Sequence, residues 1–304
     1  MDKEALRMKL LLFGKNGQLG IELQYALEPL GELIALNRMS HDYCGDVSNL
    51  DGIARSIAAI KPDVIINAAA YTAVDKAESE QELAHTINAA APEVMAHEAK
   101  RFGAKFIHYS TDYVFDGAGN KPYKETDATH PINAYGRSKK AGEDAIFASG
   151  CEHMILRTSW VYGGAGRNFV KTIIELAGAR ETLNVVNDQI GAPTGTALLA
   201  ECTAKILKDK AWVGGLYHLT ASGETSWYDY ARLIVETAKG LGASLKLSPD
   251  AIKPIPTSNY PTPAQRPLNS RLDTSKFQET FGITLPPWQN GVVAMLQQFY
   301  GNNP

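Results

Sequence analysis

A tyrosine and a lysine four positions apart, Tyr135 and Lys139, are the residues of this sequence best suited to proton transfer. Residues at i and i+4 share one face of a helix, and the surrounding pattern predicts a helix. A free phenol has a pKa of about 10, which a neighbouring ammonium lowers by favouring the phenolate. Such a pair can protonate the alkoxide that hydride addition to a carbonyl leaves. The spacing alone is weak evidence, because short patterns also arise by chance.

A third candidate, Thr111, lies about one strand–helix unit upstream in Ser110-Thr111-Asp112-Tyr113. This run follows an apolar stretch that predicts a strand, and parallel strands present their carboxyl ends to the ligand. We therefore expect Thr111 and Tyr135 to flank one carbonyl oxygen, which the Thr111 hydroxyl polarises while Lys139 also holds a nicotinamide ribose. The three residues together predict a nicotinamide-dependent carbonyl reductase.

A glycine turn follows the first predicted strand, with Gly14, Gly17 and Gly20 spaced as G-x-x-G-x-x-G. Glycine tolerates positive φ and lets the backbone approach a pyrophosphate at a helix N-terminus. The position of the turn, between a strand and a helix, supports this function more than the motif does. The turn therefore predicts dinucleotide binding.

The end of the second predicted strand bears on the choice between NADPH and NADH. An acidic residue there would bind the ribose 2′-hydroxyl and repel a 2′-phosphate, but the sequence has Asn37-Arg38. Either Arg38 contacts a 2′-phosphate, so that NADPH is accepted at least as well as NADH, or it points to solvent. Asp46 either accepts from the adenine or forms an Asx-turn. The small residues after the third strand, Ala69 and Ala70, let a flat cofactor approach.

The sequence does not support metal chemistry, because its seven histidines lie apart and are not closely paired with cysteine or carboxylate at ligand spacing. His108, inside a predicted strand, is expected to be a packed core residue. We therefore predict no metal site, and no nucleophile elbow is visible.

The composition is that of a globular protein, with 304 residues, 44% hydrophobic and 21% charged. A net charge of −3 gives no reason to expect nucleic acid or a membrane as partner. The first apolar run, Leu10–Phe13, is too short for a signal peptide or a membrane span. Three scattered cysteines do not oppose a reducing compartment, so we expect a cytoplasmic protein.

The first half of the chain alternates apolar runs with amphipathic patterns, which predicts a doubly wound parallel sheet of the Rossmann type, an α/β fold. The expected strands are 9–14, 33–36, 64–68, 105–110 and 153–157, and the expected helices are 21–27, 52–60, 81–102 and 134–148.

The second half has a looser pattern, with helices expected at 168–179 and 196–208 and a strand at 215–219. The proline-rich segment 249–267 is expected to be an ordered irregular loop. We therefore expect an extension over residues 1–7 and an NAD(P)-binding domain over 8–160, which residues 182–212 could rejoin. Residues 161–304 would form mainly a smaller, interleaved substrate-binding domain of mixed α/β structure.

Several motifs together resemble the dTDP-4-dehydrorhamnose reductases, a family of the extended short-chain dehydrogenase/reductases. The likeness runs from about Met8 to the C-terminus, and its carriers are LLFGKNGQLG, NAAAYTAVDKAE, HYSTDYVFDG, YGRSK, RTSWVYG, NDQIGAPT and TPAQRPLNSRL. The resemblance implies NAD(P)H-dependent reduction of the 4-keto group of dTDP-4-dehydro-β-L-rhamnose, the last step of dTDP-L-rhamnose synthesis.

The resemblance also implies roles for individual residues. Thr111, Tyr135 and Lys139 would form the catalytic triad. Asp112, Trp160 and Asn168 would contact the sugar, whose C–H bonds can pack on an indole face, and Arg266 would suit the diphosphate. The cofactor would contact Gly14, Gly17, Gln18, Leu19, Gly20, Asn37, Arg38, Asp46, Val47, Ala69, Ala70, Tyr71 and Thr72.

The sequence departs from the family pattern in two places. Many members end the second strand in Asp, where this chain has Asn37. Some relatives bridge a homodimer through Mg²⁺ on surface carboxylates; Glu22 is present here, but the aligned positions are Ala197 and Gln298. Mg²⁺ prefers charged oxygen donors, so a tight site is not expected and the oligomeric state stays open.

Four other functions fit parts of the pattern. A nucleotide-sugar dehydratase would need a glutamate after the aspartate, where this chain has Asp112-Tyr113. An epimerase would need a tightly retained cofactor and rotation of the sugar, and a talose-forming ketoreductase would differ in the stereochemistry of its product at C4. A regulatory subunit on the same fold would not need the triad, so the presence of Thr111, Tyr135 and Lys139 favours catalysis.

Overall fold

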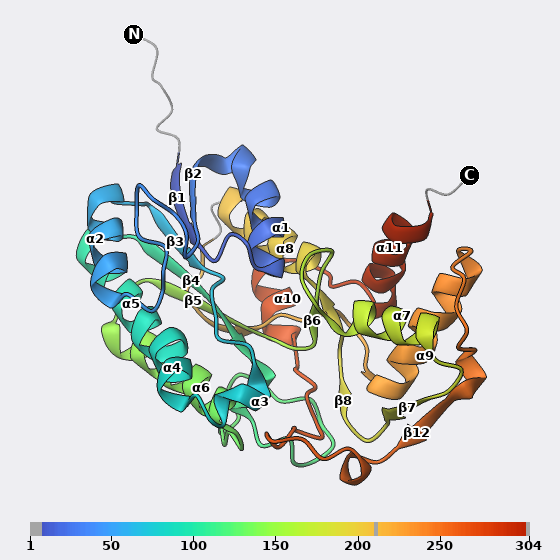
Figure 1. The fold of residues 1–304 in the computed structure, drawn as a ribbon. Helices are drawn as coiled ribbons and strands as arrows, with labels where there is room; N and C mark the ends of the chain where they lie inside the picture. Colours follow the sequence, from blue (N-terminus) through green and yellow to red (C-terminus); the bar gives the residue numbers. More distant parts are fainter. Residues whose placement is uncertain (1–7, 210–211, 302–304) are drawn as a thin grey trace.

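The computed structural model describes residues 8–209 and 212–301, so the predicted extension at 1–7 lies outside the described residues. A parallel six-stranded sheet forms the centre of the molecule (Figure 1). Its strands are β1 (Met8–Phe13), β2 (Gly31–Leu36), β3 (Val64–Asn67), β4 (Lys105–Thr111), β5 (His153–Thr158) and β10 (Gly215–His218). These bounds agree with the predicted strands to within two residues, and the expected α/β fold is confirmed.

The order of the strands places a ligand cleft at a defined point. The sheet runs β10-β5-β4-β3-β1-β2, so the chain moves outward from β1 to β2 and then returns to β3 on the other side. Direct pairing sets Phe13 beside Asn67, and Asn67 beside His108. At such a switch point the loops after two neighbouring strands diverge and leave a crevice for a ligand. The loops after β1 and β3 therefore flank the expected cofactor position.

Helices cover both faces of this sheet (Figure 1). One core joins the sheet to α2 (Leu50–Ile60), α5 (Ala91–Phe102) and α6 (Ala134–Ser149). The other joins it to α1 (Gln18–Leu27), α8 (Thr196–Lys208) and α10 (Ser275–Phe281). The predicted helix over 81–102 consists of α4 (Gln81–His85), a π-helical turn (Thr86–Ala90) and α5, with the short α3 (Val74–Ala77) before it.

Helix α6, which carries the tyrosine–lysine pair, has clear signals at both ends. The Asn133 side chain caps its start by accepting a hydrogen bond of 2.8 Å from the Gly136 amide. Gly150 ends it with φ of 64°, a left-handed conformation that glycine adopts at low cost. The position of Tyr135 on the first turn of α6 is thus fixed by local sequence.

A second hydrophobic core lies beside the sheet and involves α7 (Phe169–Ala179), α9 (Trp227–Gly240) and α11 (Trp288–Tyr300). Two strands accompany it, β7 (Leu183–Val186) and β12 (Ile252–Ile255), which pair in parallel. The prediction of an irregular loop over 249–267 was therefore wrong at β12. Pro254 favoured a loop in the sequence, because proline is rare inside strands. It is tolerated here because β12 is an edge strand of a two-stranded sheet.

Short paired segments connect the two cores: β6 (Val161–Tyr162) with β9 (Thr194–Gly195), and β8 (Ile190–Gly191) with β11 (Thr225–Ser226). Across residues 8–209 and 212–301, none of the helices combines the length and apolar character that a membrane span requires.

Candidate active site

The glycine turn after β1 is tightly packed against its surroundings. Gly14 has φ of +88°, and a Cβ atom there would lie 2.7 Å from the Ala69 nitrogen. A Cβ atom at Gly20 would lie 2.0 Å from the Gly14 carbonyl oxygen. Gly17 donates its amide to that oxygen at 3.0 Å and stands at the start of α1 without a side-chain cap. The turn can thus present free amides to an anion at the N-terminus of α1.

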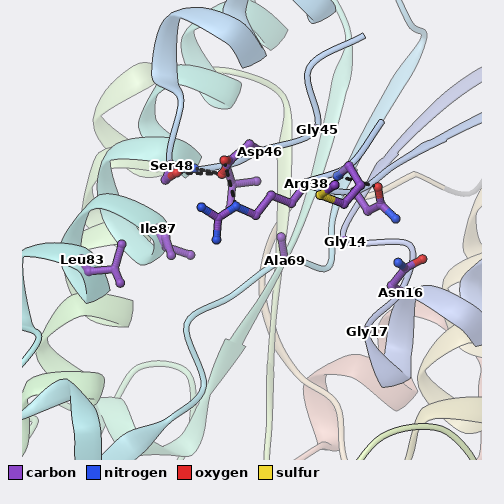
Figure 2. Close-up of a pocket in the computed structure, with 13 residues that line it drawn as sticks. Gly14, Asn16, Gly17, Arg38, Gly45, Asp46, Ser48, Ala69, Leu83 and Ile87 are labelled. Atoms are coloured by element: carbon purple, nitrogen blue, oxygen red, sulfur yellow. Dashed lines mark hydrogen bonds and ion pairs between the residues drawn. The ribbon is translucent and has the colours of Figure 1, made fainter. Parts of the chain in front are cut away.

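A pocket of about 410 Å³ opens beside this turn (Figure 2). Its walls come from the turn, from the loop after β2, from the loop after β3 and from the helical segment 81–90. Its volume is in the range of ligand sites. The predicted cofactor residues that line it are Gly14, Gly17, Asn37, Arg38, Asp46, Val47 and Ala69, and the lining residues that sequence reasoning missed are Asn16, Met39, Gly45, Ser48, Leu83 and Ile87.

Charged groups gather at one end of the pocket. Arg38 Nε lies 3.2 Å from Asp46 Oδ2, and the arginine side chain is 80% exposed (Figure 2). Asp46 Oδ1 also accepts from the Ser48 amide at 3.0 Å, so the Asx-turn is present. Burial raises the pKa of Asp46, but the Ser48 hydrogen bonds and the Arg38 charge outweigh it and lower the pKa overall. Arg38 thus projects from the pocket rim as an accessible cation.

Two side chains expected near the cofactor are held by local contacts instead. The Asn37 side-chain oxygen accepts from the Met39 amide at 2.9 Å, which closes the turn after β2. The exposed Tyr71 phenol donates to Glu80 at 2.5 Å. Gln18, Leu19, Gly20, Ala70, Tyr71 and Thr72 do not line the pocket, although Gly20 packs directly under the turn.

The predicted catalytic hydroxyls lie together at the end of β4. Thr111 ends the strand, and its hydroxyl donates to Asp112 Oδ1 at 3.1 Å. Tyr135 is partly buried beside it, and its ring meets the Tyr113 ring edge to face, with 5.4 Å between the ring centroids. Burial raises the pKa of Tyr135, while the nearby Thr111 hydroxyl opposes that shift. Tyr135 is therefore a neutral phenol that can donate a proton.

Lys139 is almost wholly buried, with 2% of its surface exposed. Its Nζ donates to the Tyr109 carbonyl oxygen at 2.7 Å and lies 3.1 Å from His108 Nε2. Burial lowers the pKa of Lys139 to about 8, against a smaller opposite effect of Glu143. Lysine therefore exchanges its proton at a pH close to neutrality, as a proton carrier requires.

His108 is buried, with 1% of its surface exposed, but the expectation of a simple packed core residue was incomplete. Both of its ring nitrogens have polar partners, because Nδ1 lies 3.1 Å from the Asn67 side-chain nitrogen. Burial and the charge of Lys139 hold the pKa of His108 well below its usual range. The imidazole is therefore neutral and belongs to the polar network of Lys139.

Unpartnered polar atoms gather at the carboxyl ends of β4 and β5. Among the described residues, Ser110 Oγ, Asp112 Oδ2 and Thr158 Oγ1 are buried without a hydrogen bond. Burial raises the pKa of Asp112 to about 6, against a smaller opposite effect of the nearby Ser270 and Thr111 hydroxyls. Orphaned buried acceptors and donors are costly, so their gathering at one edge indicates a place for a polar ligand.

Arg266 reaches the same region from the proline-rich segment. It forms an ion pair of 2.8 Å with Asp75 on α3, while its Nη1 is buried without a partner among the described residues. Arg266 is thus already oriented by one carboxylate and keeps donors unused.

Trp160, expected beside the sugar, has a left-handed backbone with φ of +47°, which is unfavourable for a bulky residue. Its ring stacks on Trp227 at 3.6 Å, and a Cβ atom at Gly191 would lie 2.6 Å from its indole. Trp227 in turn donates to Gln189 at 3.1 Å. Sequence reasoning assigned no role to Trp227 or Gly191, although Gly191 stands in the motif NDQIGAPT.

The positions aligned with the Mg²⁺ ligands of relatives do come together. Glu22, Ala197 and Gln298 line a second pocket of about 160 Å³, away from the glycine turn. They supply one carboxylate, one amide and no donor from Ala197, so this set does not fit a hard cation. Across 8–209 and 212–301, no group of three or more His, Cys, Asp or Glu residues could hold a metal ion.

Comparisons with known proteins agree with this geometry. The family described as "RmlD substrate binding domain" matches residues 8–300. The dTDP-4-dehydrorhamnose reductase of Escherichia coli (strain K12) is 56% identical over 96% of this chain and 98% of its own length. That of Shigella flexneri is 55% identical, with the same coverage of each chain. The Bacillus anthracis enzyme in complex with NADP superposes with a TM-score of 0.88 at 34% identity, covering 96% of this chain and 99% of that one.

Proposed function

This chain belongs to the RmlD family of dTDP-4-dehydrorhamnose reductases, and we propose from that membership how its residues divide the reaction. The reaction is reduction by NAD(P)H of the 4-keto group of dTDP-4-dehydro-β-L-rhamnose to dTDP-β-L-rhamnose, the final step of dTDP-L-rhamnose synthesis. The observation that carries the assignment to this site is the placement of buried Thr111, partly buried Tyr135 and buried Lys139 at one end of the parallel sheet.

A dinucleotide fits the glycine turn. The packing of Gly14 and Gly20 leaves no room for a side chain, and the free amides at the start of α1 suit a pyrophosphate. The pocket between the loops after β2 and β3 suits the adenosine half. The bound nicotinamide supplies the hydride that reduces C4 of the sugar. Every other group in the reaction comes from the chain itself.

Tyr135 gives its phenolic proton to the 4-oxygen as the hydride reaches C4. Thr111 polarises the carbonyl when its hydroxyl turns from Asp112 Oδ1 to the substrate oxygen. Lys139 stabilises the phenolate and returns a proton to it, which its pKa of about 8 allows. Carbon gains a hydride and oxygen gains a proton, so the step balances.

Substrate contacts follow from the unpartnered atoms. Asp112 Oδ2 can accept from a sugar hydroxyl, and Arg266 Nη1 can donate to the diphosphate while Asp75 holds the other side of the guanidinium. Trp160 would pack against the sugar from its stack on Trp227. For Asn168 we assign a linking role, because both of its N–H groups already donate, to Gln18 and to Gly163.

NADPH is the cofactor that we expect to be used at least as well as NADH. Arg38 is accessible at the pocket rim, and the Asp46 carboxylate beside it is already occupied by Ser48 and Arg38. Replacing Arg38 by alanine should lower kcat/KM with NADPH at least about tenfold and leave that with NADH nearly unchanged. An unchanged ratio of the two constants would show that Arg38 only points to solvent.

The rival reactions differ in a single residue and in the product. A dehydratase needs a carboxylate base after Asp112, but Tyr113 stands there, and burial raises its pKa to about 12. The proposal is tested by supplying the 4-keto sugar nucleotide with NADPH and determining the configuration of the product at C4. A rhamnose product supports the proposal, and a talose product indicates the alternative ketoreductase. Absence of turnover with normal NADPH binding indicates a regulatory protein.

We place the protein in the cytoplasm, in keeping with its free Cys44, Cys151 and Cys202. Within this proposal the monomer and the homodimer are both compatible with the site, which lies in one chain.

A further inference from the structure

A chain of buried side chains leads from β3 to the catalytic lysine. Asn67, His108 and Lys139 follow one another at 3.1 Å and 3.1 Å, and none exposes more than 2% of its surface. Asn67 and His108 are direct neighbours in the register of β3 and β4. The roles proposed above do not use Asn67 or His108.

The orientation of the Asn67 amide is fixed by the backbone. The Ala69 N–H, which can only donate, points at Asn67 Oδ1 at 3.1 Å. The NH₂ group of Asn67 must therefore face His108 Nδ1, and it can only donate there. Because two donors cannot share this contact, Nδ1 carries a lone pair and the imidazole proton sits on Nε2.

This tautomer has a consequence for the lysine. With its proton on Nε2, His108 donates toward Lys139 Nζ, which can accept only as a neutral amine. The amine keeps N–H groups for the Tyr109 carbonyl, 2.7 Å away. An ammonium would put two donors against each other at 3.1 Å, or would force the Asn67 amide to turn and lose Ala69.

We infer that Asn67 and His108 are positioning residues that stabilise Lys139 in the state it reaches after giving a proton to the Tyr135 phenolate. During reduction the 4-oxygen takes the Tyr135 proton, the phenolate takes one from the lysine ammonium, and the resulting amine accepts the hydrogen bond of His108. Solvent returns the proton afterwards. This inference rests on the proposed reductase function only for its kinetic consequences.

Other ionisable groups near Lys139 come from three elements. On α6, Tyr135 precedes it and Glu143 follows it; Arg157 on β5 holds Glu143 by hydrogen bonds of 2.8 and 2.6 Å. In the turn that follows β4, Asp112 lies near Tyr135. Glu143 raises the pKa of Lys139, whereas the tautomer set by Asn67 favours the neutral amine and so opposes the effect of Glu143.

The tautomer can be measured without substrate or cofactor. In protein labelled with ¹⁵N-histidine, at a pH of about 9 where Lys139 is mostly neutral, His108 Nδ1 should resonate as an unprotonated nitrogen and Nε2 as a protonated one. The Asn67→Asp variant replaces the donor by an acceptor of the same shape and should reverse the two signals. A protonated Nδ1 in the unaltered protein would overturn the inference, whatever the enzyme reduces.

The kinetic test separates the tautomer from simple charge. In the Asn67→Asp variant, the pH at which kcat falls on the alkaline side should rise by about one unit or more, because His108 then accepts a hydrogen bond from the Lys139 ammonium. In a His108→Phe background, which breaks the chain, Asn67→Asp should shift that pH by clearly less. An equal shift in both backgrounds would mean that the carboxylate acts through space, and would contradict the inference.

Discussion

The side-chain amide of Asn168 donates a hydrogen bond of 2.9 Å to Gln18 Oε1, which joins the start of α7 to the first turn of α1. Asn168 also caps α7 by accepting from the Lys171 amide at 3.1 Å. The residue that begins a helix of the second core thus holds a residue of the glycine turn. We therefore expect a change at the start of α7 to affect the glycine turn through these two side chains.

Breaking this link should weaken NADPH binding. Asn168→Ser keeps a helix cap but is too short to reach Gln18, and Gln18→Ala removes the partner. Each should raise the Kd for NADPH by a few fold, because a single hydrogen bond contributes about 0.5–1.5 kcal/mol. The double variant should raise the Kd for NADPH no more than either single variant does, because both substitutions remove the same interaction. Fully additive effects in a fluorescence titration would disprove the coupling.

Gly20→Ala should impair cofactor binding sharply. The added Cβ would lie 2.0 Å from the Gly14 carbonyl oxygen, so the glycine turn must shift. We expect the Kd for NADPH to rise by about a hundredfold, the cost of a 1 Å misplacement at such a site. Gly178→Ala on α7 is the matched control, because no atom lies within 4 Å of its added Cβ. It should leave the Kd unchanged and raise the free energy of unfolding by about 0.5 kcal/mol.

Tyr135→Phe should bind NADPH normally and lose most turnover. The variant removes only the proton that the 4-oxygen receives, so kcat should fall by about 10²–10⁴-fold. Tyr217→Phe, which also removes a buried hydroxyl, here bonded to the Val213 carbonyl, is the control for stability. Full activity of Tyr135→Phe would refute the assignment of the proton donor.

The low pKa of Lys139 should give opposite trends in activity and stability. Above a pH of about 8 the ammonium is lost from the folded protein, so kcat for reduction should fall as the pH rises. The unfolded chain keeps its proton up to the ordinary pKa of 10.5, so between these values unfolding takes up a proton. The contribution of Lys139 to the free energy of unfolding must then increase with pH.

Denaturant titrations of the unaltered protein and of Lys139→Met at several pH values isolate this contribution. The difference between the two should grow in favour of the unaltered protein between pH of about 8 and about 10.5. A constant difference over that range would mean that the folded-state pKa of Lys139 is not lowered.

Gly191→Ala should affect the sugar nucleotide and not the cofactor. The new Cβ would lie 2.6 Å from the Trp160 indole and push the ring from its stack on Trp227. We expect KM for the sugar nucleotide to rise about tenfold, because that indole is proposed to pack on the sugar. The Kd for NADPH should not change. Gly240→Ala, with no atom within 4 Å of its Cβ, should alter neither value.

The sequence predicted the parts of the fold that local patterns determine. Apolar runs and the glycine turn identified the strands β1 to β5, and Thr196–Lys208 was predicted to the residue. Helix α9 was missed, although its buried residues, Tyr230 and Ile234 among them, recur at helical spacing and Ser226 caps its start. The strand β12 was missed because its proline resembles a loop signal.

In the candidate site, too, residues in short local motifs could be predicted from the sequence, and residues that depend on distant contacts could not. Tyr135, Lys139 and Thr111 stand in short motifs, so their types and spacing pointed to them. Asn67 and His108 act through a contact across two strands, and their meaning depends on the direction of an amide that only the Ala69 backbone reveals. Arg266 was expected at a diphosphate, but its pairing with Asp75, 191 positions away, could not be read from spacing.

The strand β10 completes the sheet late in the synthesis of the chain. It pairs with β5 through Gly215–His218, so the edge of β5 is closed by residues that are synthesised more than fifty positions later. A ribosome-bound chain that ends after β5 would expose a row of unpaired backbone groups on an apolar strand, a template for aggregation. Chains truncated between β5 and β10 should therefore be insoluble. During translation the same edge of β5 must stay unpaired until β10 has been synthesised.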